Sequence, residues 1–268
     1  MIQIGHTPDP DDAFMFYYLS KIAKDSGIEL VLDDIESLNK KVIMNAIDCS
    51  AVSFYTYFKV AHRYDLLSVG ACFGENYGPI LVEKKIVYSQ PKEVVAVPGM
   101  HTTAFLLLKI YNNNLPSIFC PFDRIPGLVI DEKVKYGILI HEMQQTYSEY
   151  GLAKAVDLGE YWFNLTNLPL PLGCIVIRKG FPDSIKRFVK ETIKKSLQYS
   201  LTHKEEALEY AMEFARFTQK KDTQDFINKY VKDFSLEIYG PYRKSIDEML
   251  KIVLSHNLIS TKIVINII

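Results

Sequence analysis

The sequence predicts an α/β protein of two lobes, each built on a mixed, mainly parallel sheet with flanking helices. Short apolar segments alternate with amphipathic ones through the first two thirds of the chain, which is the order of βαβ units. The alternation begins again near Pro91, which predicts a second unit of the same kind. Each unit has a buried strand that follows a charged turn and ends at a polar residue, Ser53 or His141. We therefore expect a cleft between a larger lobe of residues 1–88 and 175–268 and a smaller lobe of residues 89–174.

Composition excludes several classes of protein. Of the 268 residues, 48% are hydrophobic and 24% are charged, which is typical of a folded protein and not of disordered, collagen-like or coiled-coil chains. The 31 Lys and Arg residues nearly balance the 32 Asp and Glu residues, giving a net charge of -1. This balance provides no general attraction to nucleic acid or anionic lipid. We therefore expect neither a nucleic-acid partner nor a membrane partner.

Cysteine usage and the absence of targeting segments predict a cytoplasmic protein. No apolar run reaches the roughly 18 residues that span a bilayer, and the first residues lack the basic region of a secretory signal. The cysteines form no CxxC pair, which argues against a zinc site and against a disulfide framework. They are Cys49, Cys72, Cys120 and Cys174. We expect all of them to be reduced.

Apolar periodicity predicts the individual elements. Short apolar runs between turn residues indicate strands, and apolar residues at three- and four-residue spacing indicate helices. In the first lobe we expect strands at 2–5, 28–34, 49–54, 66–70 and 79–88, and helices at 11–24, 37–47 and 54–62. In the second unit we expect strands at 94–99, 116–120, 136–141 and 173–178, and helices at 102–112, 123–131 and from about Glu142.

The connecting and C-terminal segments complete this prediction. Residues 167–173 contain two prolines and a terminal glycine, which predicts a loop. Residues 74–80 are also bounded by glycine and proline, as is common in loops that border sites or act as hinges. The pattern over 181–256 is nearly all amphipathic helix, and 262–268 is expected to be a last strand.

The segment HTPDPDDAF joins a predicted strand to a predicted helix. Asp9 suits the helix N-cap, and the carboxylates of Asp11 and Asp12 suit the positive end of the helix dipole. Capping is a commoner explanation than a metal site built from the three carboxylates, because no second group of ligands is visible. His6 and Thr7 end the strand, where they can face the cleft.

The segment VPGMHTTAF is the strongest candidate binding element. Gly99 permits a tight turn, and the helix that begins near Thr102 offers free backbone N–H groups. The hydroxyls of Thr102 and Thr103 add donors suited to a carboxylate or phosphate, although simple capping explains the same pattern equally well. Neither GxGxxG nor GxxxxGK[ST] occurs, so the segment is neither a dinucleotide fingerprint nor a P-loop.

The segment LIHEMQQTY ends an apolar strand at His141. A structural role is the commoner one for a single histidine, but imidazole titrates near neutral pH and is suited to act as a general base. Gln144 lies one turn further on, where it can bond to a ligand. Ser53 ends the corresponding strand of the first lobe and is expected to donate a hydrogen bond, since no G-x-S-x-G motif surrounds it. Ligands of open α/β sheets bind beyond the carboxyl ends of strands, so we expect these residues to share one cleft.

Eight segments, in order from Gly5 to Arg178, resemble the 1,4-dihydroxy-6-naphthoate synthase (MqnD) branch of the MqnA/MqnD menaquinone biosynthesis family. They are HTPDPDDAFMFYYL, DDIESLNKK, AVSFYTY, GENYGPILV, VAVPGMHTTAFLLLK, PFDRI, GILIHEMQQTY and LPLPLGCIVIR. The resemblance implies a fold similar to type 2 periplasmic binding proteins. It also implies cleavage of cyclic dehypoxanthinyl futalosine to 1,4-dihydroxy-6-naphthoate, with no metal or organic cofactor. The helical segment after residue 180 carries no such motif.

The resemblance also assigns residues. It makes His141 the general base and places ligand contacts at Asn39, Ser53 and Thr103, with Gln144 following the base. Together with Thr102 and backbone N–H groups, Thr103 would hold the carboxylate of a small-molecule substrate. Ser53 and Asn39 would orient oxygens on the ring or sugar. His141 would then remove a proton, so that loss of the sugar-derived fragment leaves an aromatic bicycle.

Two positions depart from the family pattern, and two other functions remain open. His101 lies beside the expected carboxylate site, at a position where the family usually has an apolar residue. Met143 stands where the family usually has a small residue, and it is expected to narrow the pocket. The alternatives are a non-enzymatic solute-binding protein of the same fold and a chorismate dehydratase. The sequence leaves open whether the chain forms a homodimer.

Overall fold

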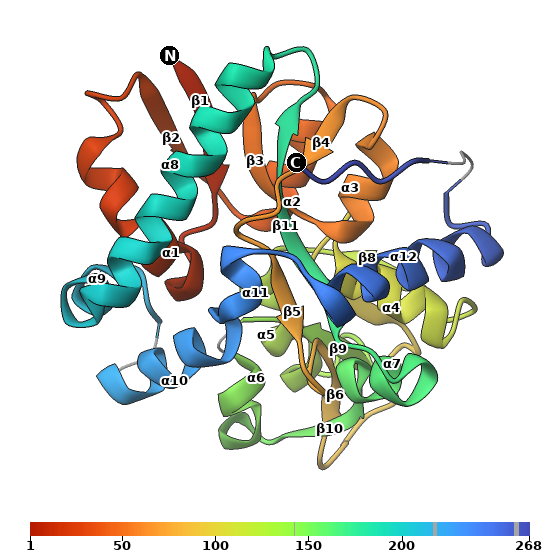
Figure 1. The fold of residues 1–268 in the computed structure, drawn as a ribbon. Coiled ribbons are helices and arrows are strands. Elements are labelled where there is room, and N and C mark those ends of the chain that lie inside the picture. Colours follow the sequence, from red (N-terminus) through yellow and green to blue (C-terminus); the bar gives the residue numbers. More distant parts are fainter. Residues whose placement is uncertain (142, 217–218, 260–262) are drawn as a thin grey trace.

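The computed structural model describes residues 1–141, 143–216, 219–259 and 263–268 (Figure 1). Within them the strands form two mixed sheets with flanking helices, which confirms the predicted α/β class. The expectation that the sheets are mainly parallel is wrong, because most of the strand pairs are antiparallel. One sheet occupies the upper half of Figure 1 and the other the lower half, while β5 (Cys72–Gly74) and β11 (Leu170–Arg178) run between them. The molecule therefore has the predicted two lobes.

The first sheet has the strand order β2-β1-β3-β11-β4, with β5 also pairing with β11. These strands are β1 (Ile2–His6), β2 (Ile28–Leu32), β3 (Cys49–Ser53), β4 (Tyr64–Leu66), β5 (Cys72–Gly74) and β11 (Leu170–Arg178). Parallel pairing joins β1 to β2 and β3 through the crossover helices α1 (Pro10–Ile22) and α2 (Ile35–Ile43), and α3 (Phe54–Val60) follows β3. The strand β11 returns from the other lobe and runs antiparallel to its neighbours.

The second sheet has the order β10-β6-β9-β7-β8. Its strands are β6 (Ile80–Lys84), β7 (Val95–Val97), β8 (Ser117–Phe119), β9 (Tyr136–Leu139) and β10 (Leu152–Asp157). Its helices are α4 (Thr103–Tyr111), α5 (Ile125–Ile130), α6 (Met143–Thr146) and α7 (Leu158–Thr166), with 3-10 turns at η1 (Phe122–Arg124) and η2 (Tyr147–Tyr150). Sequence reasoning missed β10 and α7, and the expected helix start at Glu142 lies outside the described residues.

Two strands lie elsewhere than the sequence suggested. β6 pairs within the second sheet, although its residues fall in the segment 1–88 expected to build the larger lobe. The expected loop 167–173 is wrong from Leu170 onward, because β11 begins there and pairs with β5. Proline is tolerated in a strand at a bulge, and the pairing of β11 shifts register between Pro171 and Gly173.

The C-terminal segment is helical, as predicted. Its helices are α8 (Asp183–Thr202), α9 (Lys204–Met212), α10 (Lys220–Tyr230), α11 (Asp233–Leu236) and α12 (Gly240–Ser255). The helices α8 and α9 pack on α1, and α10 reaches towards the second lobe in Figure 1. Of the expected last strand, Ile267 forms a parallel bridge to Leu66, and residue 262 lies outside the described residues.

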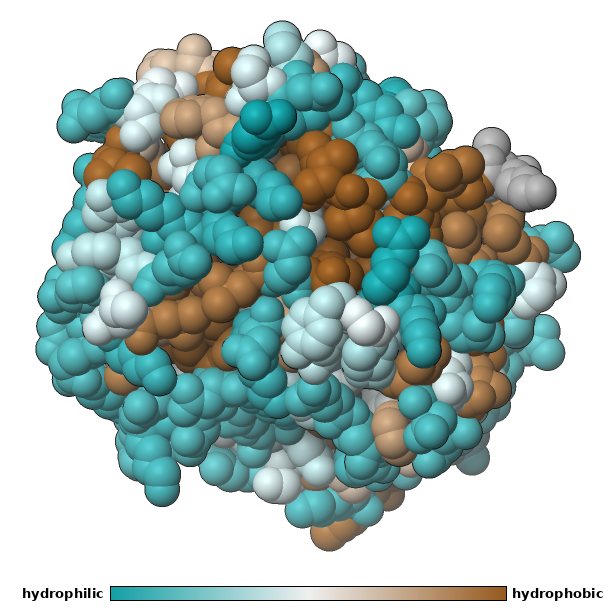
Figure 2. Space-filling view, in the orientation of Figure 1, coloured by the Kyte–Doolittle hydropathy of each residue, from teal (hydrophilic) through white to brown (hydrophobic). Residues whose placement is uncertain are grey.

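Apolar side chains form cores in both lobes. One core continues from the first lobe into the second and includes the fully buried Tyr57 and Trp162, while another joins α1 to the C-terminal helices. The face in Figure 2 is mostly hydrophilic, with hydrophobic residues gathered around the C-terminal segment and in a separate area on the left of the view. Among the described residues, no helix combines the length and apolar character needed to cross a bilayer.

Candidate functional site

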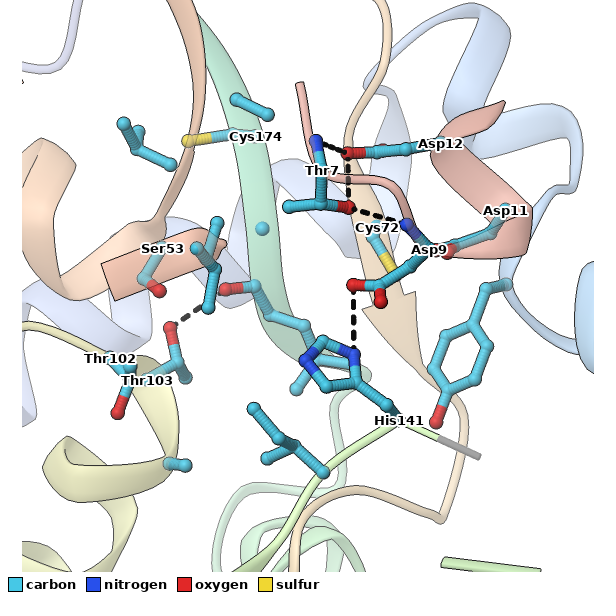
Figure 3. Close-up of a pocket in the computed structure, with 18 of the residues that line it drawn as sticks. Thr7, Asp9, Asp11, Asp12, Ser53, Cys72, Thr102, Thr103, His141 and Cys174 are labelled. Carbon is cyan, nitrogen blue, oxygen red and sulfur yellow. Dashed lines mark hydrogen bonds and ion pairs between the residues drawn. The ribbon is translucent and has the colours of Figure 1, made fainter. Parts of the chain in front are cut away.

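A cavity of about 150 Å³ lies between the two sheets (Figure 3). Much of its polar lining comes from residues at or just beyond the ends of β1, β3 and β9 and from the N-terminus of α4. Its apolar walls include Val52, Ile140 and Leu172. The cavity therefore lies where ligands of α/β sheets bind, beyond the carboxyl ends of parallel strands.

An ion pair between His141 and Asp9 spans this cavity. The Nδ1 atom of His141 lies 2.9 Å from Oδ2 of Asp9, and both side chains are largely buried. Asp9 follows β1 of the first lobe, whereas His141 follows β9 of the second. Because Nδ1 is bound to Asp9, the other ring nitrogen, Nε2, is left to face the side of the cavity with Ser53 and Thr103 (Figure 3).

The backbone and a neighbouring ring fix the direction of the imidazole. His141 has a left-handed backbone conformation, with φ of 62°, and such conformations in non-glycine residues are often associated with functional sites. The ring of Phe122 packs edge-on against it, with 4.7 Å between ring centroids. These constraints direct Nε2 into the cavity.

The pair shifts the pKa values of both members. Burial alone would lower the pKa of His141, but the adjacent Asp9 carboxylate outweighs it and raises the pKa above its ordinary value. Burial alone would raise the pKa of Asp9, but attraction to His141 and the hydrogen bond from His141 lower it instead. Asp9 is therefore a carboxylate that makes the imidazole more basic.

The other carboxylates of HTPDPDDAF have different surroundings. The N–H and hydroxyl of Thr7 each donate to Oδ2 of Asp12 at 2.8 Å, and burial raises the pKa of Asp12 to about 6. Burial, reinforced by the neighbouring carboxylates, raises the pKa of Asp11 well above its usual range. Both residues line the cavity, as Thr7 does.

The sequence suggested two roles for Asp9, helix capping and metal binding, and neither describes its side chain. Asp9 occupies the N-cap position of α1 but makes no side-chain capping bond, because its carboxylate binds His141. Among the described residues, no three His, Cys, Asp or Glu side chains are arranged to hold a metal ion. His6 is buried against Phe16 and does not line the cavity, and burial lowers its pKa to about 4.

The N-terminus of α4 forms another wall. Thr102 caps the helix, since its hydroxyl accepts from the Phe105 N–H at 3.2 Å and donates to the Gly99 carbonyl at 2.9 Å. The hydroxyl of Thr103 donates to the Leu172 carbonyl at 2.7 Å. Within the described residues, the backbone N–H groups of Thr103 and Ala104 make no hydrogen bond. These two N–H groups are therefore available to an anionic ligand.

Ser53 lines the cavity, whereas Asn39 lies behind it. The Nδ2 of Asn39 donates to Oγ of Ser53 at 3.2 Å, and the Ser53 N–H donates to Oδ1 of Asn39 at 2.9 Å. Asn39 is fully buried and is not part of the lining. It therefore holds Ser53 in place, and the Ser53 hydroxyl keeps its own proton to donate.

Gln144 is fixed by residues of both lobes. Its Nε2 donates to the Leu139 carbonyl at 3.3 Å, and its Oε1 accepts from the Tyr230 hydroxyl at 3.1 Å. Tyr230 and Phe226 of α10 line the same cavity. Sequence reasoning missed both, because the helical C-terminal segment carries no motif that marks them.

The two departures from the family pattern lie outside the cavity. His101 lines a neighbouring groove, and burial together with Lys59 lowers its pKa to about 4, so its ring is neutral near pH 7. Met143 packs against a core cluster of the second lobe instead of narrowing the cavity. Neither side chain therefore changes the charge or the size of the site.

Comparison with known proteins identifies the family. A family model described as menaquinone biosynthesis matches residues 2–254. This chain belongs to that family. The 1,4-dihydroxy-6-naphthoate synthase of Thermus thermophilus is 35% identical over 239 residues, with 88% of each chain covered. The enzyme of the same name from Streptomyces coelicolor is 28% identical over 245 residues, covering 88% of this chain and 87% of its own.

Solved structures place the menaquinone-family chain among proteins of a periplasmic-binding-protein-like fold. A crystal structure from Archaeoglobus fulgidus is 35% identical with a TM-score of 0.89, covering 96% of this chain and 98% of its own. The alkanesulfonate-binding protein SsuA of Xanthomonas axonopodis pv. citri has a TM-score of 0.72 at 7% identity, covering 98% and 96%. The second likeness shows the fold alone, and it confirms the predicted fold.

Proposed function

We propose that this chain cleaves cyclic dehypoxanthinyl futalosine to 1,4-dihydroxy-6-naphthoate in menaquinone biosynthesis, as a lyase with His141 as its general base. The names of the relatives support the reaction. The observation that carries the proposal is that His141, with Nδ1 bound to Asp9, lines one cavity together with Thr103 and Ala104, whose backbone N–H groups make no hydrogen bond within the described residues. A base and an anion site on opposite walls suit deprotonation of a carboxylate-bearing ring.

Substrate binding follows from the walls of the cavity. The N–H groups of Thr103 and Ala104, at the positive end of the α4 dipole, hold the substrate carboxylate. The hydroxyl of Thr102 caps the helix, so this residue contributes by shaping that end. Ser53 donates to an oxygen of the ring or sugar, with Asn39 holding it from behind. Gln144 is fixed beside the base.

The chemical step needs one proton transfer. Neutral His141 removes a proton from the bound ring through Nε2, while Asp9 holds Nδ1–H and stabilises the imidazolium that forms. The bond to the sugar-derived fragment then breaks, the fragment departs with the bonding electrons, and the bicycle becomes aromatic. Aromatisation supplies driving force. The apolar walls exclude water from the reacting atoms.

The proposal also implies where the protein works and which class of substrate it takes. Like other biosynthetic enzymes that act on small molecules, it would work in the cytoplasm on a carboxylate substrate. In this proposal Asp9 positions the base, a role that neither the residue patterns nor the family resemblance gave to it.

Substitution of the base provides the direct test. Purified protein is incubated with cyclic dehypoxanthinyl futalosine, and the naphthoate is followed by chromatography. Wild type should form product, and His141→Ala should lose about 10²–10⁴-fold in turnover because general-base catalysis is of that size. Binding of the substrate, measured by calorimetry, should persist in the variant. His256→Ala is the matched control, since His256 is exposed at the end of α12.

Other outcomes separate the alternatives. Binding without product in the wild type would favour a solute-binding protein. Conversion of chorismate instead of the futalosine compound would favour the dehydratase. Equal turnover in wild type and His141→Ala would refute the assignment of the base.

A further inference from the structure

Side chains of the first lobe hold the peptide groups of His101 from both sides. Its N–H donates to Oε2 of Glu36 at 3.0 Å, and its carbonyl accepts from Oγ1 of Thr56 at 2.9 Å. Glu36 lies in α2 and Thr56 in α3, whereas His101 comes just before α4 of the second lobe. The residue that leads into α4 is therefore held to the opposite lobe on both sides of its backbone, in addition to the bond from Thr103 to Leu172.

Glu36 fits closely against the turn that precedes α4. It is only 8% exposed, and a Cβ added to Gly99 would lie 2.2 Å from its Oε2 and 2.4 Å from its Cδ. Gly99 is not among the glycines with positive φ. A side chain at this position would therefore displace the carboxylate of Glu36, whereas the backbone conformation itself does not call for glycine.

The same helix also holds the facing wall of the cavity. Asn39 follows Glu36 by three residues, a spacing that places both on one side of α2. Asn39 exchanges two hydrogen bonds with Ser53, and Figure 3 shows Ser53 beside Thr103. One turn of α2 therefore fixes the positions of both Ser53 and the N-terminus of α4.

Ionic attraction contributes little to this contact. Lys40 Nζ lies 3.9 Å from Glu36 Oε1 and its side chain is 57% exposed, and exposed pairs of this kind are weak. The ring of His101 is neutral near pH 7 because burial and Lys59 lower its pKa. Glu36 thus acts on the backbone N–H as a hydrogen-bond acceptor.

We propose that Glu36 is a positioning residue that fixes the separation between Ser53 and the anion-binding N–H groups of α4. This inference rests on the proposed function, because it supposes that one substrate is bound by both groups at once. Glu36 itself does not line the cavity. Its loss lets the N-terminus of α4 move away from Ser53, so the two groups no longer match the substrate.

Steady-state kinetics with the futalosine substrate test the role of the acceptor. Glu36→Ala should raise KM about tenfold with a smaller change in kcat, because binding of the carboxylate weakens before and during the reaction alike. Glu36→Gln should stay within about threefold of wild type, because its amide oxygen still accepts the bond. Lys40→Ala is the control for charge and should match wild type. An unchanged KM in Glu36→Ala, or equal defects in the Ala and Gln variants, would overturn the inference.

A double-mutant cycle with Gly99 tests the contact itself. Gly99→Ala alone should raise KM because its methyl group collides with Glu36. In the Glu36→Ala background the collision is absent, so the second substitution should add little. Residues in contact give such non-additive effects, whereas independent effects add. Additive defects would mean that the two residues act separately.

Hydrogen exchange of the His101 amide separates this inference from the proposed function. It is followed by NMR on labelled protein without substrate, so it needs no activity. Exchange should be at least tenfold faster in Glu36→Ala than in wild type and Glu36→Gln. Equal rates in all three would overturn the contact. Absence of naphthoate from the wild type would refute the proposed function while leaving this measurement valid.

Discussion

His141 obtains its chemical character from its neighbours. An unperturbed imidazole titrates near neutral pH, and here the 2.9 Å contact with Asp9, reinforced by Asp11, raises the pKa of His141 and leaves Nε2 directed into the cavity. Asp9 and His141 are separated by more than 130 positions in the chain and belong to different lobes. A motif search therefore finds each residue without finding the pair.

Asp9→Asn should change the pH dependence of catalysis. Without the carboxylate, burial lowers the pKa of His141, so the acid limb of kcat/KM should move to lower pH. Turnover at the optimum should fall by about 10²-fold, because the imidazolium that forms is no longer stabilised. Asp25→Asn, on an exposed turn beyond α1, removes one charge elsewhere and should leave the profile unchanged. An acid limb that stays in place would contradict the role of Asp9.

The same pair should make folding stability depend on pH. The raised pKa of His141 contributes stability that is complete below its ordinary value of 6.5 and is lost as pH rises through the raised value. The lowered pKa of Asp9 contributes stability above its ordinary value of 3.8 that is lost as pH falls through the lowered value. The stability difference between wild type and Asp9→Asn, from denaturant unfolding, should therefore be largest between these ordinary values. A difference that grows above pH 8 would contradict this.

At the scale of elements, helix ends and strand ends bring the site together. Thr102 caps α4 through the Phe105 N–H, while the N–H groups of Thr103 and Ala104, which line the cavity, make no hydrogen bond within the described residues. Asp34 caps α2 by accepting from the N–H groups of Glu36 and Ser37, which starts the helix that holds Ser53 through Asn39. The capping residues can be predicted from the sequence, but their effect on the geometry of the site cannot.

The contact between α7 and the segment leading into β6 leaves no room for a side chain. A Cβ at Gly159 would lie 2.0 Å from the Tyr77 carbonyl carbon and 2.2 Å from the Gly78 nitrogen. Gly159→Ala must shift backbone, so it should lower the free energy of unfolding by about 1–3 kcal/mol. Gly127→Ala in α5 meets no atom within 4 Å and should raise it by about 0.5–1 kcal/mol. Denaturant unfolding of both variants measures this contrast, and similar changes in the two would refute it.

At the scale of the molecule, the lobes are joined across the cleft as well as by the crossing chain. The His141–Asp9 pair, the Tyr230–Gln144 hydrogen bond and the Glu36–His101 hydrogen bond all link one lobe to the other. A ligand that occupies the cavity touches both lobes and therefore stabilises the folded molecule as a whole.

Thermal unfolding with the product should show this stabilisation. A ligand at about 100 times its Kd stabilises a protein by about 2.7 kcal/mol, which for a chain of this size raises Tm by roughly 5–10 °C. We expect that shift with 1,4-dihydroxy-6-naphthoate, in wild type and in His141→Ala. The naphthalenediol without a carboxylate should give a much smaller shift at the same concentration, because it cannot use the N-terminus of α4. Equal shifts would refute the carboxylate site.

The sequence by itself determined the α/β class, the two lobes, the helical C-terminal segment and the strand ends that carry Ser53 and His141. Those features depend on local periodicity and on the rule that places ligands beyond strand ends. Only the tertiary structure decided that Asp9 binds His141 instead of capping α1, that Asn39 stands behind Ser53, and that Tyr230 completes the cavity. The tertiary structure also decided that the proline-containing segment from Leu170 is part of β11, because it pairs with β5. Such contacts join residues far apart in the chain, so they depend on how the lobes pack and leave no local pattern in the sequence.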